Sequence, residues 1–205
     1  MASKITQAIA TSLGGRMDGR SILVQCYRNL LEMVEDRELR LVQSCQSAHA
    51  LLAAVQNAEP VLVAGDDDGG FLHVYVDAEE RTGVKFLRQL RDKHAEEDSL
   101  LIVNVEGATP FTKKEVGDDP HVEFWMVREL LLNPTRHKLV PPHRLMPAAE
   151  VDALQSRRCI ADHQWPVMYA TDIVARWYKF PKGGIVHIER RGIGHEKGDY
   201  YRKVV

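Results

Sequence analysis

The chain has few cysteines, no long hydrophobic run and almost no net charge. Its three cysteines, Cys26, Cys45 and Cys159, form no CxxC pair. This small odd number argues against a disulfide framework and fits a reducing compartment, where we expect each thiol to be a small buried hydrophobic group. A structural zinc site needs paired ligands at short spacing, and Cys159 with His163 is a single pair, so we expect no metal.

Signatures of the commonest enzymes and membrane proteins are also missing. No apolar run approaches the roughly 18 residues that span a bilayer, so we expect no membrane partner. The sequence contains no GxSxG elbow, no HExxH motif and no P-loop. Its nine histidines are scattered, and no carboxylate pair is isolated in an apolar run. We therefore expect a protein without catalytic residues, cofactor or small-molecule substrate.

Two local runs resemble ligand-binding loops but do not meet their requirements. An EF-hand loop starting in the Asp66-Asp67-Asp68 run would need Gly at its sixth position and a bidentate carboxylate, usually Glu, at its twelfth, where Phe71 and Asp77 stand. The Gly192-x-Gly194-x-x-x-Gly198 run has no helix behind it to hold a pyrophosphate. We interpret the first run as a solvated acidic turn and the second as a hairpin turn.

The composition is that of a globular protein, and the charge divides it in two. Apolar residues make up 44% and charged residues 27% of the chain. The formal net charge of -2 hides 14 basic against 22 acidic residues in residues 1–134, and 13 against 7 in residues 135–205. Opposite signs in the two parts predict two domains with different partners, divided near Asn133-Pro134-Thr135.

Hydrophobic periodicity predicts an α+β fold with a mixed sheet in the first part. Residues 1–16, rich in Ala, Ser and Thr, are expected to form a frayed polar tail. Helices are expected at residues 18–35, 47–56 and 83–94, and strands at 61–64, 71–76 and 100–105. Thr109 and Pro110 suit the N-cap and first turn of a further helix. Residues 126–132 are ambiguous between helix and strand.

The second part is expected to form a small α+β domain. Short helices are predicted at residues 147–154 and 172–178, and strands at 185–188 and 200–205. A domain of this size has a core that supplies little stability alone, so docking onto a partner would add the rest.

Basic and aromatic residues alternate in the second part, which leaves two interpretations open. The residues are Arg157, Arg158, Arg176, Trp177, Tyr178, Lys179, Phe180, Lys182, Arg190 and Arg191. Such a patch neutralises phosphates in a free-standing DNA-binding transcription regulator. It equally meets an acidic protein surface, with the aromatic side chains in the core. In the first part, Lys113-Lys114 after Thr109-Pro110 could contact a phosphate backbone.

The second part also carries motifs at fixed spacing. They are His137-x-Leu139-Val140-Pro141-x-His143, Pro166, Asp172-Ile173-Val174-Ala175-Arg176, Lys182-Gly183-x-Ile185-Val186-x-Ile188-x-Arg190-Arg191 and Tyr201-Arg202. The series resembles the C-terminal domain of the fifth-largest shared subunit of eukaryotic nuclear RNA polymerases I, II and III, a family whose archaeal members consist of this domain alone. The first part resembles the family more loosely, through Leu30-x-x-Met33-Val34-x-Asp36-Arg37, Gly83-Val84-Lys85, Ala108-Thr109-Pro110 and Asn133-x-Thr135-x-His137.

The resemblance implies a non-catalytic subunit of DNA-directed RNA polymerase in the nucleus, the nucleolus included. Residues 1–134 would form a jaw domain with a restriction-endonuclease-like topology and without nuclease residues, lying near downstream double-stranded DNA. Residues 135–205 would dock on the largest subunit. The implied DNA-proximal loop is Thr109, Pro110, Phe111, Thr112, Lys113 and Lys114. The implied docking residues are His137, Pro141, His143, Asp172, Arg176, Lys182, Gly183, Arg190, Arg191, Tyr201 and Arg202.

Three positions depart from the family pattern. Ile173 replaces the proline that follows the helix-capping aspartate, Gly198 replaces the first tyrosine of the closing motif, and Phe111-Thr112 replaces Ser-Ala. These departures fit a divergent or polymerase-specific paralogue. A nuclease using Asp77 or Glu79 is the remaining alternative that the jaw-like fold suggests.

Overall fold

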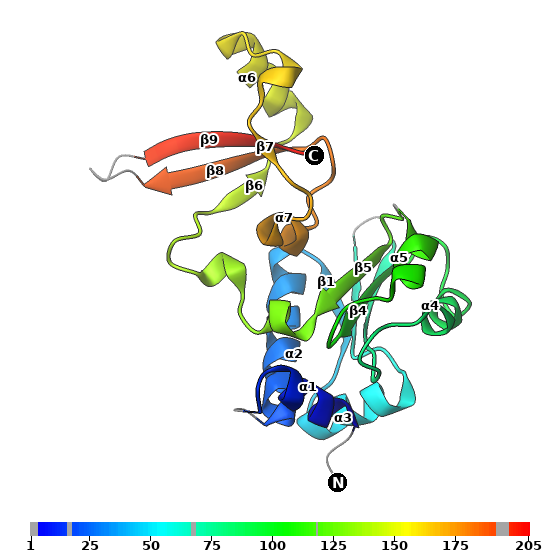
Figure 1. Ribbon diagram of the computed structural model, residues 1–205. Helices are drawn as coiled ribbons and strands as arrows, with labels where there is room; N and C mark the ends of the chain where they lie inside the picture. Colours follow the sequence, from blue (N-terminus) through cyan, green and yellow to red (C-terminus); the bar gives the residue numbers. More distant parts are fainter. Residues whose placement is uncertain (1–3, 16–17, 67–68, 118, 192–196) are drawn as a thin grey trace. The chain divides into compact units, whose positions relative to one another are not determined.

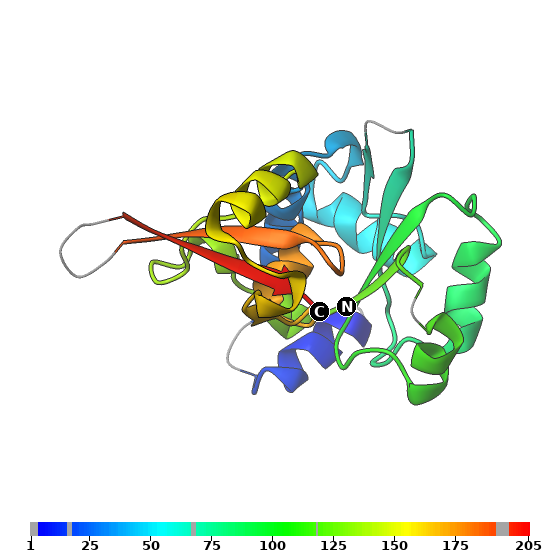
Figure 2. The same ribbon diagram turned by 90° about the horizontal axis from the view of Figure 1, so that it is seen from above.

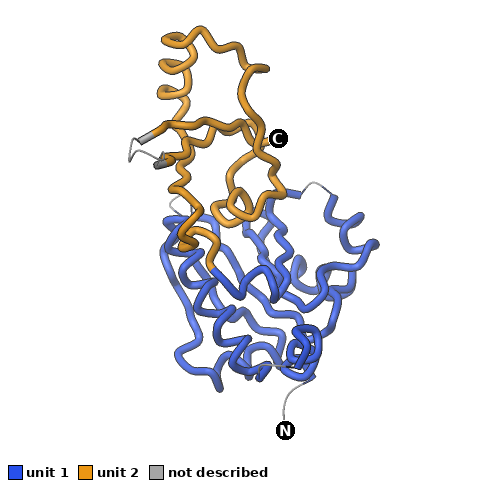
Figure 3. Tube along the Cα trace, turned by 60° about the vertical axis from the view of Figure 1, so that its left-hand side comes forward, with its two compact units in different colours: residues 1–132 blue, residues 133–205 orange. Residues whose placement is uncertain are grey.

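The computed structural model describes residues 4–15, 18–66, 69–117, 119–191 and 197–205. The chain divides into two compact units, Met1–Leu132 and Asn133–Val205 (Figure 3). Unit 1 contains a five-stranded sheet and unit 2 a four-stranded sheet, each with its own helices. The predicted α+β fold class with a mixed sheet is confirmed.

The sheet of unit 1 has the strand order β1-β2-β3-β4-β5. The strands are β1 (Arg40–Ser44), β2 (Leu62–Gly65), β3 (Phe71–Val76), β4 (Ser99–Asn104) and β5 (Val122–Met126). The first three are antiparallel neighbours, whereas β3, β4 and β5 run parallel. Parallel neighbours need crossover connections, and α4 (Val84–Arg91) and α5 (Pro110–Val116) supply them.

Helices cover both faces of this sheet. The crossover helices α4 and α5 lie on one side, and α2 (Gly19–Asp36) and α3 (Ala48–Asn57) lie on the other (Figures 1 and 2). On the first side, Leu87 and Leu90 of α4 pack against Tyr75 and Ile102 of the sheet. After β5, the ambiguous segment forms the 3-10 helix η1 (Val127–Leu130), which packs against α2.

The end of α2 is joined to the sheet by a buried ion pair. The Arg37 guanidinium donates two hydrogen bonds to Glu123 in β5, Nη1 to Oε1 at 3.0 Å and Nη2 to Oε2 at 2.8 Å. The side chains are only 4% and 16% exposed. Their bidentate geometry fixes orientation as well as distance, so it sets where α2 meets β5.

The predicted helix starts are confirmed by their caps. The Asp18 side chain accepts the N–H of Ser21 at the start of α2, and the Ser47 side chain accepts the N–H of Ala50 at the start of α3. Each cap satisfies a backbone donor that has no partner within its helix.

The expected frayed tail at residues 1–16 is wrong. Residues Lys4–Ser12 form α1, which buries Ile5 and Ile9. A Cβ atom at Gly19 would lie 1.8 Å from the backbone oxygen of Thr6. Only glycine therefore permits α1 to pass so close to the start of α2, and burial of the two isoleucines overrides the polar composition.

The sheet of unit 2 has the strand order β6-β8-β9-β7. The strands are β6 (His143–Leu145), β7 (Val167–Met168), β8 (Ile185–Arg191) and β9 (Lys197–Val204). Residues 185–188 and 200–204 confirm the two predicted strands. The interior of the predicted 192–198 turn, with Gly192 and Gly194, lies outside the described residues.

Two small cores lie on the two faces of this sheet. Val186 and Ile188 pack with Val174 and Ala175 of α7 (Ile173–Tyr178). Ile185 packs with Leu154 of α6 (Ala148–Arg158). We call these surfaces the α7 face and the α6 face.

The expectation of three buried thiols is wrong for two of them. Cys26 is buried and lies 3.4 Å from the carbonyl oxygen of Val127, and burial raises its thiol pKa to about 12. Cys45 is half-buried, and Cys159 is exposed at the end of α6. None of the helices in the described part of the chain is both long and apolar enough to cross a membrane.

Candidate functional site

The predicted loop at residues 109–114 forms the start of α5. The Thr109 hydroxyl oxygen accepts the N–H of Thr112 at 3.3 Å, and Pro110 occupies the first helical turn. Proline suits this position because its missing N–H would have no partner there. The N-cap prediction from the sequence is confirmed.

A buried polar network holds this loop to the sheet. The Asn104 side chain at the end of β4 donates to Thr82 Oγ1 at 2.7 Å and to the Gly107 carbonyl at 2.8 Å. Its Oδ1 atom accepts the Gly107 N–H at 2.6 Å. The Thr112 hydroxyl donates to the Thr82 carbonyl at 2.9 Å. Because each of these buried groups has a partner, the loop is held in one conformation.

The outward side chains of the loop are apolar or basic. Phe111 is 79% exposed, and Pro110, Lys113 and Lys114 are also exposed. Within the described residues, neither lysine forms an ion pair. Thr112 is buried and its hydroxyl is bonded, so its side chain does not lie on this surface. The loop thus presents one aromatic ring and two cations.

In unit 2, strand register gathers several motif residues on the α7 face. Arg202 is paired with the core residue Val186, and His143 is paired with the core residue Ile188. Directly opposite residues in an antiparallel ladder share a face. Arg190 lies two residues beyond Ile188 on the same face, and its guanidinium lies 4.9 Å from the centre of the Tyr200 ring.

Three of the motif residues, Asp172, Arg190 and Arg202, are close enough to His143 to shift its pKa. Burial lowers the pKa of His143 below its ordinary value of 6.5. The short contact of His143 Nδ1 with the Pro141 carbonyl, at 2.6 Å, and the negative charge of Asp172 raise this pKa, whereas Arg190 and Arg202 lower it. The imidazole is therefore neutral at pH 7 beside two permanent cations and one carboxylate.

Other motif residues shape the backbone around α7. Asp172 caps the helix by accepting the N–H of Val174 at 2.8 Å. Beyond the helix, Gly183 has a φ of 87° and donates its N–H to the Val204 carbonyl. A left-handed φ favours glycine, so Gly183 serves the turn rather than offering a side chain. Arg176 is half-buried within α7, and Lys182 is exposed in the turn.

Among the remaining predicted docking residues, strand register places only Tyr201, and on the opposite face. Tyr201 lies on the α6 face, stacked on His187 with ring centres 5.1 Å apart and with the Arg158 guanidinium 5.4 Å from its ring centre. His137 follows the 3-10 helix η2 (Pro134–Arg136) and accepts the N–H of Leu139. Arg191 pairs with Lys197 at the end of β8, and its side chain lies outside the described residues.

Sequence reasoning missed two groups of exposed or clustered side chains. Tyr169 is 67% exposed, Val205 46% and Ile173 36%. Tyr169 and Val205 lie side by side, because Ala170 N donates to the Val205 carbonyl and Val205 N donates to the Met168 carbonyl. In a one-dimensional pattern, these residues look like ordinary strand and helix interiors.

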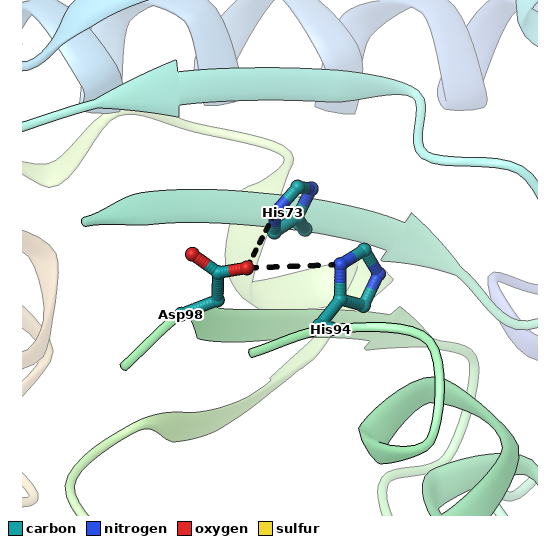
Figure 4. Close-up of side chains that lie close together, drawn as sticks. All are labelled: His73, His94 and Asp98. Atoms are coloured by element: carbon teal, nitrogen blue, oxygen red, sulfur yellow. Dashed lines mark ion pairs between the residues drawn. The ribbon is translucent and has the colours of Figure 1, made fainter. Parts of the chain in front are cut away.

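The second missed group is in unit 1. His73, His94 and Asp98 gather between β3 and the segment before β4 (Figure 4). The spacing of His94 and Asp98 could have indicated the pair, but His73 is brought to them only by the fold.

Comparison with known proteins connects both units to one family. The family model described as RNA polymerase Rpb5, C-terminal domain, matches residues 132–204. The subunit RPABC1 of DNA-directed RNA polymerases I, II and III from Caenorhabditis elegans is 31% identical over 151 residues, covering 71% of this chain and 72% of the relative. Its counterpart from Dictyostelium discoideum is 28% identical over 184 residues, covering 85% and 92%.

A shorter match involves a subunit of another RNA polymerase. Subunit 5A of DNA-directed RNA polymerase V from Arabidopsis thaliana is 32% identical over 71 residues, covering 35% of this chain and 32% of the relative. The matches to RPABC1 extend well beyond the C-terminal domain and span most of the relatives' length. The chain therefore belongs to the Rpb5, or RPABC1, family of DNA-directed RNA polymerase subunits.

Proposed function

We propose that the protein is a structural, non-catalytic subunit of a nuclear DNA-directed RNA polymerase. Family membership over most of the chain is the observation that carries this function. The charge division supports different tasks for the two units, since residues 135–205 are basic and residues 1–134 are acidic. Unit 2 then serves assembly, and unit 1 serves as the jaw.

The assembly surface proposed here is the α7 face of unit 2, and its partner is the largest polymerase subunit. Arg190 and Arg202 supply positive charge to this face, and His143 lies within their field. Exposed Tyr169 and Val205 add apolar surface at the adjoining end of the sheet. Charged groups steer association, while buried aromatic and aliphatic side chains supply much of the affinity.

The proposed DNA contact of unit 1 is local. An acidic unit repels a phosphate backbone over most of its surface, so close approach to downstream DNA requires cations at one point. Lys113 and Lys114 supply them, and the Asn104 network holds their helix in place. Phosphate contacts of this kind position the duplex without reading its sequence.

Purification of the tagged full-length protein from its own cells tests the function. The two largest polymerase subunits should be recovered in stoichiometric amounts, and their absence would contradict the proposal. An Arg190→Ala/Arg202→Ala variant should recover much less polymerase. The matched control is Arg157→Ala, an exposed arginine on α6.

The role of unit 1 is tested on polymerase that contains Lys113→Ala and Lys114→Ala. Assembly should be unchanged, whereas the salt dependence of downstream DNA engagement should decrease by about one unit of slope for each lysine that binds a phosphate. Lys93→Ala is the control, since Lys93 is another exposed lysine of the same unit. Loss of assembly in the double variant would show that the roles of the two units are reversed.

A further inference from the structure

Three side chains that ligate metals well in other proteins converge in unit 1. His73 lies on β3, His94 follows α4, and Asp98 precedes β4 (Figure 4). His73 Nε2 lies 3.3 Å and His94 Nδ1 4.0 Å from the same oxygen, Asp98 Oδ2. One ligand atom from each residue lies within 4.8 Å of the other two. Within the described residues, no other group of three such side chains is this compact.

Hydrogen bonding alone does not account for this arrangement. The His94 Nδ1 atom faces the carboxylate from beyond hydrogen-bonding distance. The two imidazole rings have centres only 3.9 Å apart. The side chains of His73, His94 and Asp98 are only 13–14% exposed. Polar groups buried to this degree are expected to be better satisfied.

One separation already fits a tetrahedral metal site, and the others lie within 4.8 Å. Bonds of about 2.0–2.1 Å from zinc to imidazole nitrogen and carboxylate oxygen place ligand atoms about 3.3 Å apart. The His73–Asp98 separation already has this value, and the His94–Asp98 separation needs a small rotamer adjustment. Two imidazoles with one carboxylate favour zinc over magnesium or calcium, which prefer oxygen ligands.

The surroundings supply an orienting partner and access from solvent. The Tyr75 hydroxyl lies 2.7 Å from His94 Nε2, so its oxygen can accept a hydrogen bond from Nε2–H in the tautomer whose Nδ1 is free to ligate. The Asp98 carboxylate is held by the N–H groups of Phe71 and Ala95. A cavity of about 440 Å³, lined by His94, Asp98 and His121, opens onto this cluster.

We propose that His73, His94 and Asp98 form a binding site for one divalent transition-metal ion, with zinc the best fit. The ion would fasten residues 92–98 to β3 and complete its coordination with water from the cavity. Zinc on His73 Nε2 leaves the ring proton on Nδ1, which is buried. The affinity should therefore be lower than that of a four-ligand structural site.

The test uses the untagged, chelator-treated full-length chain, because a histidine tag would itself bind zinc. Calorimetric titration should show one zinc ion per chain, no comparable magnesium binding, and a higher melting temperature with zinc. Binding should weaken by roughly tenfold or more in His94→Gln and in His73→Gln. Hydrogen exchange of residues 92–98 should slow when zinc is added to the unmodified chain.

Two further variants make the result decisive. His187→Gln is the matched control, since His187 also contacts an aspartate, Asp199, but belongs to no group of three metal-ligating side chains among the described residues. It should bind zinc as the unmodified chain does. If the His94 and His73 variants do not fold, the Tyr75→Phe variant tests the proposal instead. Its zinc affinity should be lower by roughly 10- to 100-fold. No zinc binding by the unmodified chain, or equal binding by the cluster variants, would overturn the proposal.

Discussion

The two proposed contact surfaces of the molecule are built by different means. In unit 1, Phe111, Lys113 and Lys114 are displayed by a short helix that buried side-chain hydrogen bonds attach to β4. In unit 2, Arg190 and Arg202 are displayed by the alternation of paired strands. The first surface therefore depends on a few polar groups, and the second on the register of a whole sheet.

This difference teaches how to interpret the charge division. A net positive charge in unit 2 leaves its cations on both faces, with Arg202 on the α7 face and Arg158 beside Tyr201 on the α6 face. A net negative charge in unit 1 still leaves two exposed lysines at one tip. Net charge identifies two domains, but local structure decides which side chains a partner can reach.

The largest expected effect is the loss of stability when a core side chain is truncated, and it should differ between the two units. Ile102→Ala in β4 and Ile188→Ala in β8 each remove a buried side chain and should each cost about 2–5 kcal/mol. Unit 2 is shorter and should have the lower free energy of unfolding. Ile188→Ala should therefore unfold unit 2, while the amide protons of unit 1 remain protected from exchange. Hydrogen exchange resolved by unit measures this, with Ile102→Val and Ile188→Val as controls. Joint unfolding of both units by Ile188→Ala would show that their stabilities are coupled.

The polar network should be the next most sensitive feature. Asn104→Ala removes three hydrogen bonds and leaves the Gly107 backbone groups and Thr82 without their partner. The free energy of unfolding should decrease by about 1–3 kcal/mol, and exchange at residues 105–112 should accelerate. Chemical denaturation with hydrogen exchange checks both. Lys114→Ala, an exposed change on the same helix, should alter neither.

The two helix caps give a matched comparison between the surfaces. Thr109→Ala at α5 and Asp172→Ala at α7 each leave an orphan N–H and should each cost about 1 kcal/mol. Only Asp172→Ala should also lower the pKa of His143, because it removes a negative charge that raises this pKa. Thermal denaturation measures the first effect and NMR titration of His143 the second. An unchanged His143 pKa would contradict the proposed electrostatic grouping on the α7 face.

The smallest expected effect is a dependence of stability on pH, which both units should show. The pKa values of His94 and His143 are lowered below 6.5, mainly by burial. The unfolded chain therefore takes up protons before the folded one does, so stability is fully present above about pH 6.5 and falls as the pH decreases below it. His94→Gln should flatten this dependence in unit 1, and His143→Gln in unit 2. The free energy of unfolding, measured with chelator at about pH 7.5 and 5.5, provides the comparison. If a variant loses as much stability between these pH values as the unmodified chain does, its histidine is not a source of the pH dependence.

Local signals in the sequence predicted the helices well. Apolar spacing located α2 and α3, and the N-cap Thr109 was predicted because a cap depends on neighbours within three residues. Short edge elements escaped detection. β6 and β7 are too short to show a period, and β1 exposes Leu41 and Val42 on an edge strand. The restriction-endonuclease-like topology of the jaw stays a prediction.

The sequence by itself determined the fold class, the resemblance to polymerase subunits and the positions of most helices, since these depend on local pattern and on ordered motifs. Tertiary structure alone decided which motif residues share a face. His143 and Arg202 are far apart in the chain, and only the pairing of β6 and β9 with β8 places them together. The same holds for His73 and Asp98, because strand order and register depend on contacts between distant segments.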